Sequence, residues 1–218
     1  MIRLHAYWRS SASWRVRIVL RWKGLAYEVV PVHLVREGGE QNHAAYRALN
    51  PAGLLPALEI DGVVLTESMP IVEYLEETYK RPSMLPDNPK DRAHVRRLCE
   101  TVNAGIQPLQ NLRVLQRLGN ELGAEKPEVR AWARHFITIG FDALEPLLAE
   151  SAGTYCFGDQ VTFADAFLVP QIYNARRFDV DLTAYPTIVR IDEACARLDA
   201  FKAAHADAQP DRPENPTP

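Results

Sequence analysis

The first 80 residues alternate between strand-like and helix-like segments, whereas the chain after Pro89 is helix-like throughout. The residue patterns predict strands at 2–7, 27–32, 57–60 and 63–66, and helices at 13–23, 43–49 and 70–79. Asp61-Gly62 joins the last two strands as a tight hairpin. The order βαβαββα favours a parallel βαβ unit with an antiparallel hairpin at its edge. We therefore predict a small α/β domain followed by a larger all-α domain.

Three prolines between residues 81 and 89 mark the boundary between these domains: Pro82, Pro86 and Pro89. We predict an α/β domain at 1–81, a linker at 82–89, an all-α domain at 90–205 and an extended or disordered tail at 206–218.

Four helices are expected in the all-α domain. The first is predicted to begin at Asn88-Pro89, to reach Leu118 and to bend near Gly105 and Pro108. The others are predicted at 127–148, from a capping box at 162–165 onward with a kink at Pro170, and at 186–201.

Composition excludes several classes of protein. The net charge of −3 gives no basic surface for nucleic acid or an anionic membrane, and no apolar run approaches the roughly 20 residues of a membrane-spanning helix. No metal-ligand spacing or disulfide framework is found among the six histidines and three cysteines. With no signal-peptide pattern at the start, we expect a cytoplasmic protein.

The motif at residues 10–15, SSASWR, lies where the first strand gives way to a helix. A helix start offers free backbone N–H groups and a positive dipole end, and hydroxyls there can stabilise a thiolate. These features predict an anion or thiolate site, although Ser11 or Ser13 could equally serve only as the helix cap.

Other polar residues could complete such a site. The backbone of Leu55, before Pro56, could pair with a peptide-like ligand, particularly if the bond is cis. Ser68 could cap a helix or hold a carboxylate beside Glu67, which could pair with an ammonium group. Candidate carboxylate clamps and ligand contacts are Arg9, Arg15, Arg113, Arg176, Arg177, Asn103, Gln107, Gln110 and Asn111, the last four being equally explained as a solvated face.

The chain resembles the zeta-class glutathione transferases, which include maleylacetoacetate isomerases. Residues 10–17 (SSASWRVR) match the family signature SSCSWRVR, and further matches lie at residues 48–51, 67–68, 71–78, 105–112, 180–183 and 209–211. The resemblance extends from the first strand to about Pro213, so it covers nearly the whole chain.

This resemblance implies a glutathione transferase fold, with a thioredoxin-like N-terminal domain that binds glutathione, and a homodimer. It implies that Ser10 and Ser11 lie at the thiol, Glu67 and Ser68 at the γ-glutamyl end, and Gln107 at the wall of the site. The glutathione-binding residues implied are Ser10, Ser11, Ala12, Ser13, Trp14, Gln41, Leu55, Pro56, Glu67, Ser68, Gln107, Asn111 and Arg113.

Two positions depart from the family pattern. Ala12 stands where the family has cysteine, and Glu67 stands where some relatives have glutamine. Glutathione supplies the nucleophilic sulfur, so we expect Ala12 to change substrate positioning rather than abolish activity. Glu67 keeps acceptor oxygens, so binding of an ammonium group should survive.

The activity that the resemblance implies is a glutathione-dependent cis–trans isomerisation of maleylacetoacetate in aromatic amino-acid catabolism. Ser10 and Ser11 would ionise the thiol, and Arg9 and Arg176 would hold the carboxylates of the dicarboxylic cis-enedione substrate. Maleylpyruvate isomerases share these motifs. The same thiol site would also suit a general transferase that consumes glutathione, and a glutathione-binding protein without catalysis is a third hypothesis.

Overall fold

The computed structural model describes residues 1–214 and divides the chain into two compact units. Unit 1 comprises residues 1–83 and the chain from residue 196 onward, and unit 2 comprises residues 84–195. No helix among the described residues is long and apolar enough to cross a membrane.

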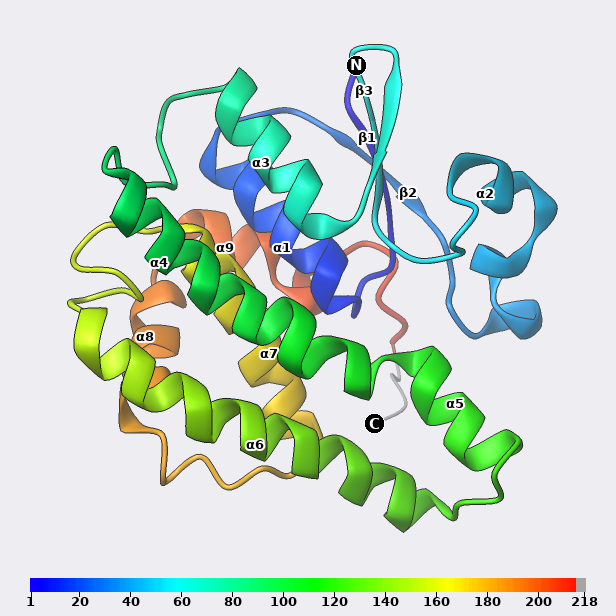
Figure 1. The fold of residues 1–218 in the computed structure, drawn as a ribbon. Coiled ribbons are helices and arrows are strands. Elements are labelled where there is room, and N and C mark those ends of the chain that lie inside the picture. The colour runs from blue at the N-terminus through cyan, green and yellow to red at the C-terminus, as the bar shows by residue number, and fades with distance from the viewer. Residues whose placement is uncertain (215–218) are drawn as a thin grey trace. The chain divides into compact units, whose positions relative to one another are not determined.

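Unit 1 contains the thioredoxin-like fold that the family resemblance implies (Figure 1). Its sheet has the strand order β2 (Glu28–Pro31), β1 (Arg3–Ala6), β3 (Ala57–Ile60), β4 (Val63–Thr66). The β1–β2 pair is parallel and the other two pairs are antiparallel, so both the βαβ unit and the hairpin are confirmed. The helices of this part are α1 (Ser11–Trp22), α2 (Ala44–Leu49) and α3 (Ser68–Thr78), with short 3₁₀ turns η1 (Arg36–Gly38) and η2 (Glu40–Asn42).

The register of this sheet brings several loops to one edge. Ala57, the first residue of β3, pairs with His5 near the end of β1 and with Thr66 at the end of β4. Ala6 pairs in turn with Pro31 at the end of β2. Because these ends coincide, the segments that follow β1, β2 and β4 and the one that precedes β3 all meet at the same edge.

A buried ion pair joins the C-terminal end of α1 to α3. The Lys23 ammonium donates to the Glu76 carboxylate at 2.7 Å and to the backbone carbonyls of Tyr79 and Pro82 at 2.6 and 3.1 Å. Lys23 and Glu76 are both buried, so the charges are paired out of contact with bulk water. The contact with Pro82 also fixes the first residue of the predicted linker.

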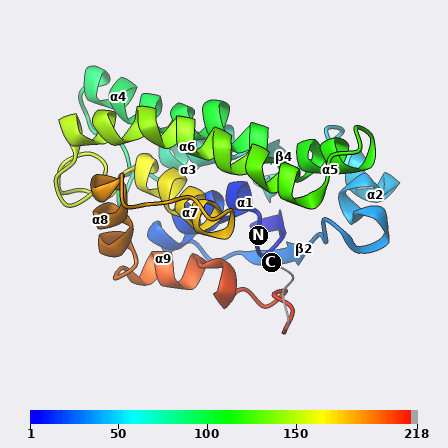
Figure 2. The ribbon, with the colours of Figure 1, turned by 90° about the horizontal axis from the view of Figure 1, so that it is seen from below.

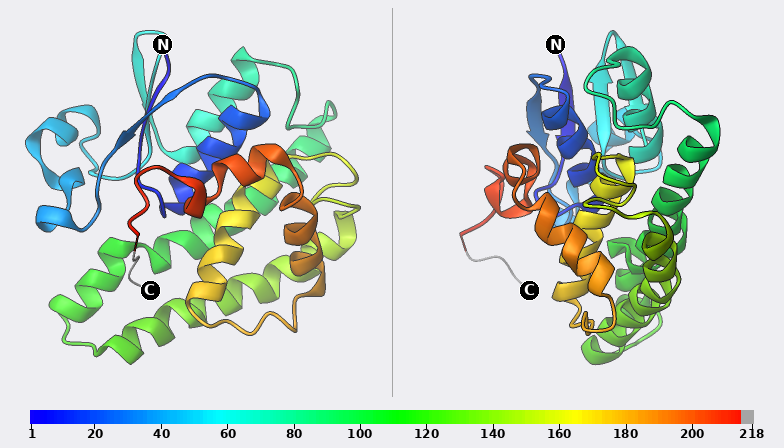
Figure 3. Two further views of the ribbon diagram at one scale, coloured as in Figure 1. Left: turned by 180° about the vertical axis from the view of Figure 1, so that it is seen from behind. Right: turned by 90° about the vertical axis from the view of Figure 1, so that its left-hand side faces the viewer.

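The C-terminal segment belongs to a different unit from the one expected. Residues 196–205 were expected in the all-α domain, but α9 (Asp199–Ala204) packs against α1 in unit 1 (Figure 3). The predicted tail from residue 206 begins with the 3₁₀ turn η5 (Ala206–Ala208), and Gln209 is buried. Ordered contacts therefore continue to at least Arg212, while residues 215–218 of that predicted tail lie outside the described residues.

Unit 2 is all-helical, and its elements are α4 (Pro89–Glu100), η3 (Thr101–Ile106), η4 (Gln107–Gln110), α5 (Leu112–Asn120), α6 (Lys126–Ser151), α7 (Phe163–Arg177) and α8 (Pro186–Cys195). The buried helix α7 packs against α4 and α8, and α6 packs against α8 (Figure 2). The predicted capping box is confirmed, because the Asp165 carboxylate accepts from the Thr162 N–H at 2.7 Å.

Two predicted helices are not continuous. The helix expected from Pro89 to Leu118 changes to a π-helical turn at Thr101 and to a 3₁₀ turn at Gln107, then ends at Asn111. Pro108 lacks the N–H that would continue an α-helix, so the predicted bend is instead a break. The helix expected at 186–201 likewise ends at Cys195 and restarts as α9.

Candidate functional site

The N-terminus of α1 is the first part of the candidate site. Ser10 has an extended backbone and its hydroxyl accepts from the Ser13 N–H at 3.2 Å, so Ser10 is the N-cap. The expectation that Ser11 or Ser13 caps the helix is therefore wrong. Ser11 and Ala12 open the helix, among the N–H groups that a helix start leaves without intrahelical partners.

Burial separates the residues of the SSASWR motif. Ser13 and Trp14 are almost completely buried, so we assign them to packing inside the protein rather than to ligand contact. Ser11 retains 7% of its surface, and Ser10 and Ala12 are partly exposed. The three residues that remain accessible are those at the positive end of the helix dipole.

A buried hydrogen bond connects this helix to the start of α3. The Arg15 guanidinium on α1 donates from Nη1 to the Ser68 Oγ at 3.0 Å, and both side chains are buried. Ser68 is the first residue of α3, so its hydroxyl hydrogen and backbone N–H stand at a second positive helix end. The two helix starts are thus linked through one arginine.

Glu67, rather than Ser68 as the sequence led us to expect, is the N-cap of α3. Its φ of +67° is uncommon for a residue with a side chain and costs on the order of 1–3 kcal/mol. Such a backbone persists only where the surrounding structure holds it, here between β4 and α3. Glu67 is exposed, which leaves a carboxylate accessible beside the Ser68 backbone.

The loop before β3 forms the third part of this edge. The Leu55–Pro56 peptide bond is cis, a geometry that the sequence alone left open. The Leu54 carbonyl accepts from the Tyr46 hydroxyl at 2.6 Å and from the Asn50 amide at 2.8 Å. Burial raises the pKa of Tyr46, so its hydroxyl remains a donor at neutral pH. The adjacent Leu55 backbone is held in place by these two side chains.

Two further predicted residues lie near the same strand ends. Gln41 lies in η2, is partly buried and donates to the Leu34 carbonyl at 3.4 Å. The Arg9 guanidinium lies 5.1 Å from the centre of the Trp8 ring and is partly exposed. Unit 1 therefore brings Arg9, Ser10, Ser11, Leu55 and Ser68 to one edge of its sheet.

Three predicted contact residues lie at the break in the first helix of unit 2. Gln107 is partly buried at the junction of η3 and η4, and Asn111 is the N-cap of α5. The Asn111 side-chain oxygen accepts from the backbone N–H of Arg113 at 3.2 Å, and the Arg113 side chain is exposed. Gln110 is buried and donates to Gln171 at 2.9 Å, so it is not part of a solvated face.

Arg176 lies in the last turn of α7 in unit 2, and its side chain is 50% exposed. Its guanidinium donates to the Asp192 carboxylate on α8 at 2.6 Å. This pairing could not be found from the sequence, because a separation of 16 residues across two helices carries no local pattern. Arg17 and Asp211, which contact the loop between β1 and α1, were missed for the same reason.

The chemistry of the unit 1 edge fits glutathione. Two helix starts with hydroxyls suit a thiolate and a carboxylate, an exposed carboxylate suits an ammonium group, and the backbone before β3 suits a peptide. These are the groups of a γ-glutamyl tripeptide with a free thiol. Among residues 1–214, no group of three or more His, Cys, Asp or Glu side chains is arranged to hold a metal ion.

The fold and this edge define a glutathione transferase. Residues 4–83 match the family model of the glutathione S-transferase N-terminal domain. The chain is 49% identical to maleylacetoacetate isomerase from Rattus norvegicus, with 96% of this chain and 94% of the rat protein aligned. It therefore belongs to the family of maleylacetoacetate isomerases, the zeta class of glutathione transferases.

Two solved structures are similar over nearly their whole length. A holo structure of maleylpyruvate isomerase, a bacterial zeta-class enzyme, has 46% identity and a TM-score of 0.93, covering 96% of this chain and 99% of its own. Maleylacetoacetate isomerase from Anaeromyxobacter dehalogenans, with dicarboxyethyl glutathione and citrate in its active site, has 46% identity and a TM-score of 0.86, covering 98% of both chains.

Proposed function

We propose that this protein is a glutathione-dependent cis–trans isomerase that converts maleylacetoacetate to fumarylacetoacetate in aromatic amino-acid catabolism. The observation that carries the proposal is the pair of helix starts: Ser10 and Ser11 lie at the start of α1, and Arg15 of the same helix donates to Ser68 at the start of α3. The close similarity to maleylacetoacetate isomerases supports the choice of substrate.

When bound, glutathione supplies a thiolate that adds reversibly to the cis double bond, so that the bond can rotate and glutathione is recovered. The chain's own task is to keep that sulfur ionised. The hydroxyls of Ser10 and Ser11 can donate to it, and the N-terminus of α1 adds a favourable dipole. Ala12 does not interfere with this task, because it is not required to supply a sulfur.

Substrate carboxylates need cationic partners, and we assign Arg9 and Arg176 to that role, with Arg113 on α5 as a further candidate. Guanidinium groups bind carboxylates through paired hydrogen bonds. Asp192 holds the Arg176 guanidinium at one end of α7. These arginines would also stabilise negative charge that develops on the substrate.

We assign the remaining predicted residues to glutathione itself. Leu55 would pair through its backbone with the cysteinyl peptide, Gln41 would lie beside it, and Glu67 and Ser68 would hold the γ-glutamyl end. The family resemblance also assigns Gln107 and Asn111 to ligand contact. We further propose a homodimer in the cytoplasm, a compartment with which the three free cysteines agree.

The proposal is tested by supplying maleylacetoacetate and glutathione and following substrate loss and free thiol together. Loss of substrate with unchanged thiol is the expected result. Stoichiometric thiol loss, also with a chlorinated electrophile, would instead identify a conjugating transferase. Glutathione binding without turnover would identify a binding protein and would make Ala12 the first position to restore to cysteine.

Maleylpyruvate is the second candidate substrate, favoured by the similarity to the maleylpyruvate isomerase structure. The two acids share the cis-enedione core, so the same residues can serve both. Measuring kcat/KM for both acids in parallel decides between them, and a higher value for maleylpyruvate would replace the substrate proposed above.

A further inference from the structure

The loop between β1 and α1 carries Arg9 and Ser10, and its backbone is held by two side chains from outside the loop. The Trp8 N–H donates to the Asp211 carboxylate at 2.8 Å. The carbonyls of Trp8 and Tyr7 accept from the Arg17 guanidinium at 2.9 and 3.3 Å. Three backbone groups just before the site are therefore fixed by side-chain charges.

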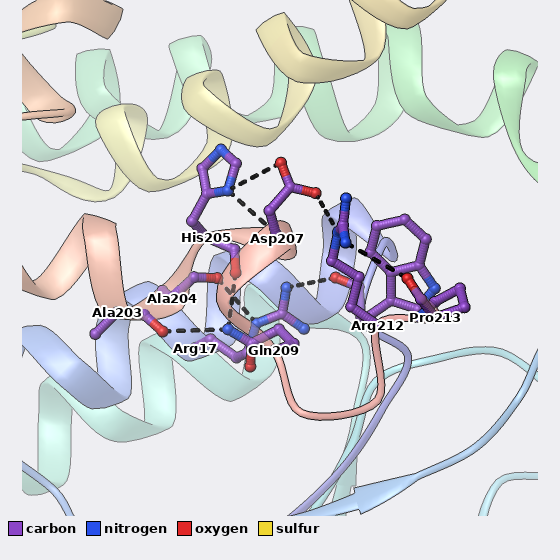
Figure 4. A network of polar contacts seen from close by, with 9 residues as sticks. Arg17, Ala203, Ala204, His205, Asp207, Gln209, Arg212 and Pro213 are labelled. Carbon is purple, nitrogen blue, oxygen red and sulfur yellow. Dashed lines mark hydrogen bonds and ion pairs between the residues drawn. The ribbon is translucent and has the colours of Figure 1, made fainter. Parts of the chain in front are cut away.

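Arg17 also connects this loop to the C-terminal segment. Its Nε donates to the carbonyl of Ala204, the last residue of α9, at 3.1 Å (Figure 4). Arg17 is only 1% exposed, and burial lowers its pKa to about 10, while Asp211 acts in the opposite direction. The guanidinium therefore remains charged at neutral pH and binds α1, the loop and α9 at once.

The segment that carries Asp211 is itself well anchored. The Gln209 amide donates to the carbonyls of Ala203 and His205 at 3.1 and 2.8 Å, and Arg212 pairs with Asp207 at 2.8 Å (Figure 4). The Arg212 guanidinium also lies 5.9 Å from the centre of the Trp8 ring. Asp211 is thus presented to the loop by a fixed turn.

The contacts of Arg17 and Asp211 with the Tyr7–Trp8 backbone, which we call the brace, are connected directly to Ser10, the N-cap of α1. The Tyr7 carbonyl that accepts from Arg17 also accepts from the Ser10 N–H at 3.0 Å. The position of Ser10 is therefore set by the same carbonyl that the buried guanidinium holds. The Asp211 carboxylate accepts from the N–H of this same Tyr7–Trp8 peptide unit. The next peptide unit, which leads into Arg9, is held by Arg17 through the Trp8 carbonyl.

We propose that Arg17 and Asp211 are positioning residues, which hold the Tyr7–Trp8 backbone so that Ser10 and Ser11 meet the glutathione thiol in the geometry that ionises it. This inference rests on the proposed function. It makes the C-terminal segment from Ala204 to Arg212 a part of the thiol-activating machinery, although no residue of that segment is assigned a contact with the ligand.

A merely structural brace would affect stability alone, so the test measures the thiol. Glutathione is bound to the full-length wild type and to Asp211→Ala, and thiolate absorbance is titrated with pH. We expect the thiol pKa in Asp211→Ala to rise by about one unit and kcat, measured at a pH below the wild-type thiol pKa, to fall about tenfold, because at such a pH one pKa unit changes the thiolate fraction tenfold.

Two further variants control this experiment. Asp211→Asn keeps an acceptor oxygen for the Trp8 N–H, so it should recover most of the lost activity. Asp199→Ala removes an exposed carboxylate from the start of α9, just before the segment from Ala204 to Arg212, and should behave as wild type. An Asp211→Ala variant with an unchanged thiol pKa and only a lower melting temperature would overturn the inference, as would an equal effect in Asp199→Ala.

The same titration separates this inference from the proposed function. If wild type leaves the pKa of bound glutathione at its solution value, the thiol-activating role of Ser10 and Ser11 fails and the brace has nothing to position. If wild type lowers that pKa and Asp211→Ala lowers it equally, only the role of Asp211 fails.

Discussion

At the scale of single residues, adjacent serines at the start of α1 have different positions and should behave differently. Ser10 is the N-cap, so Ser10→Ala should lower the free energy of unfolding by about 1 kcal/mol. Ser11 makes no cap, so its hydroxyl has only the proposed role at the thiol, whereas Ser10 has both roles. Ser11→Ala should lower kcat by about 10²–10³, the cost typical of losing one donor to a developing anion.

Urea unfolding and isomerase kinetics on both variants check this division. Ser11→Thr is the matched control, because it keeps the hydroxyl and adds only a methyl group. A Ser11→Ala enzyme within a few-fold of wild type would remove Ser11 from the thiol and leave Ser10 as the activating hydroxyl.

Which residue types form the site could be predicted, but several of their partners could not. Ser10, Ser11 and Ser68 follow from their places at predicted helix starts. The positive φ of Glu67 moved the cap of α3 by one residue, and no pattern predicts that backbone for a glutamate. Asp211 lies in a motif that the family shares, yet its contact with the Trp8 N–H is visible only in the folded chain.

At the scale of elements, turns and strands that depend on neighbouring residues were predicted correctly, whereas the continuity of the long helix in unit 2 was not. The hairpin strands at 57–60 and 63–66 match β3 and β4 because Asp-Gly fixes the turn. The long helix of unit 2 was predicted to bend, but the weak helical preference at Gly105 and the missing N–H at Pro108 end the α-helix altogether.

The end of η3, next to that break, packs against a glycine in α6. A Cβ added at Gly140 would overlap Cγ1 and Cδ1 of Ile106, a fully buried residue at the end of η3. Gly140→Ala should therefore lower the free energy of unfolding of unit 2 by about 1–3 kcal/mol, the usual cost of overpacking a core. Gln107 follows Ile106, so we expect its position to shift as well.

Gly119 on α5 offers a matched control, because a Cβ there would meet its neighbours only at 3.8 Å or more. Gly119→Ala should instead stabilise the helix by about 0.5–1 kcal/mol. Urea unfolding of both variants, followed by far-UV circular dichroism, measures the difference. Equal effects of the two substitutions would show that Ile106 adjusts without cost.

At the scale of the whole molecule, the segment that begins at Ala196 belongs to unit 1, the unit in which the chain begins. The sequence did not indicate this. Helical periodicity at 186–201 gave no reason to divide that stretch, but α9 packs against α1, as part of unit 1. Packing faces belong to pairs of elements, and the sequence of one helix does not name its partner. The division into domains therefore needed the structure, although the fold class did not.

Carboxylates in both units should make the stability of the folded protein decrease at acid pH. In unit 1, the hydrogen bond from the His33 N–H lowers the pKa of Glu40, and the hydrogen bond with His5 lowers that of Glu59. In unit 2, Thr154 lowers the pKa of Asp159 in the same way. Burial raises the pKa of Asp165, which acts in the opposite sense.

A carboxylate with a lowered pKa in the folded state contributes stability that is present above its unfolded pKa of about 4 and is lost as the pH falls through its folded value. We therefore expect the urea midpoint to decrease as the pH falls from about 7 to about 3. Glu40→Gln removes one of these groups, so its midpoint should be lower at neutral pH and should decrease less steeply. A wild-type midpoint that stays constant over this range would contradict the prediction.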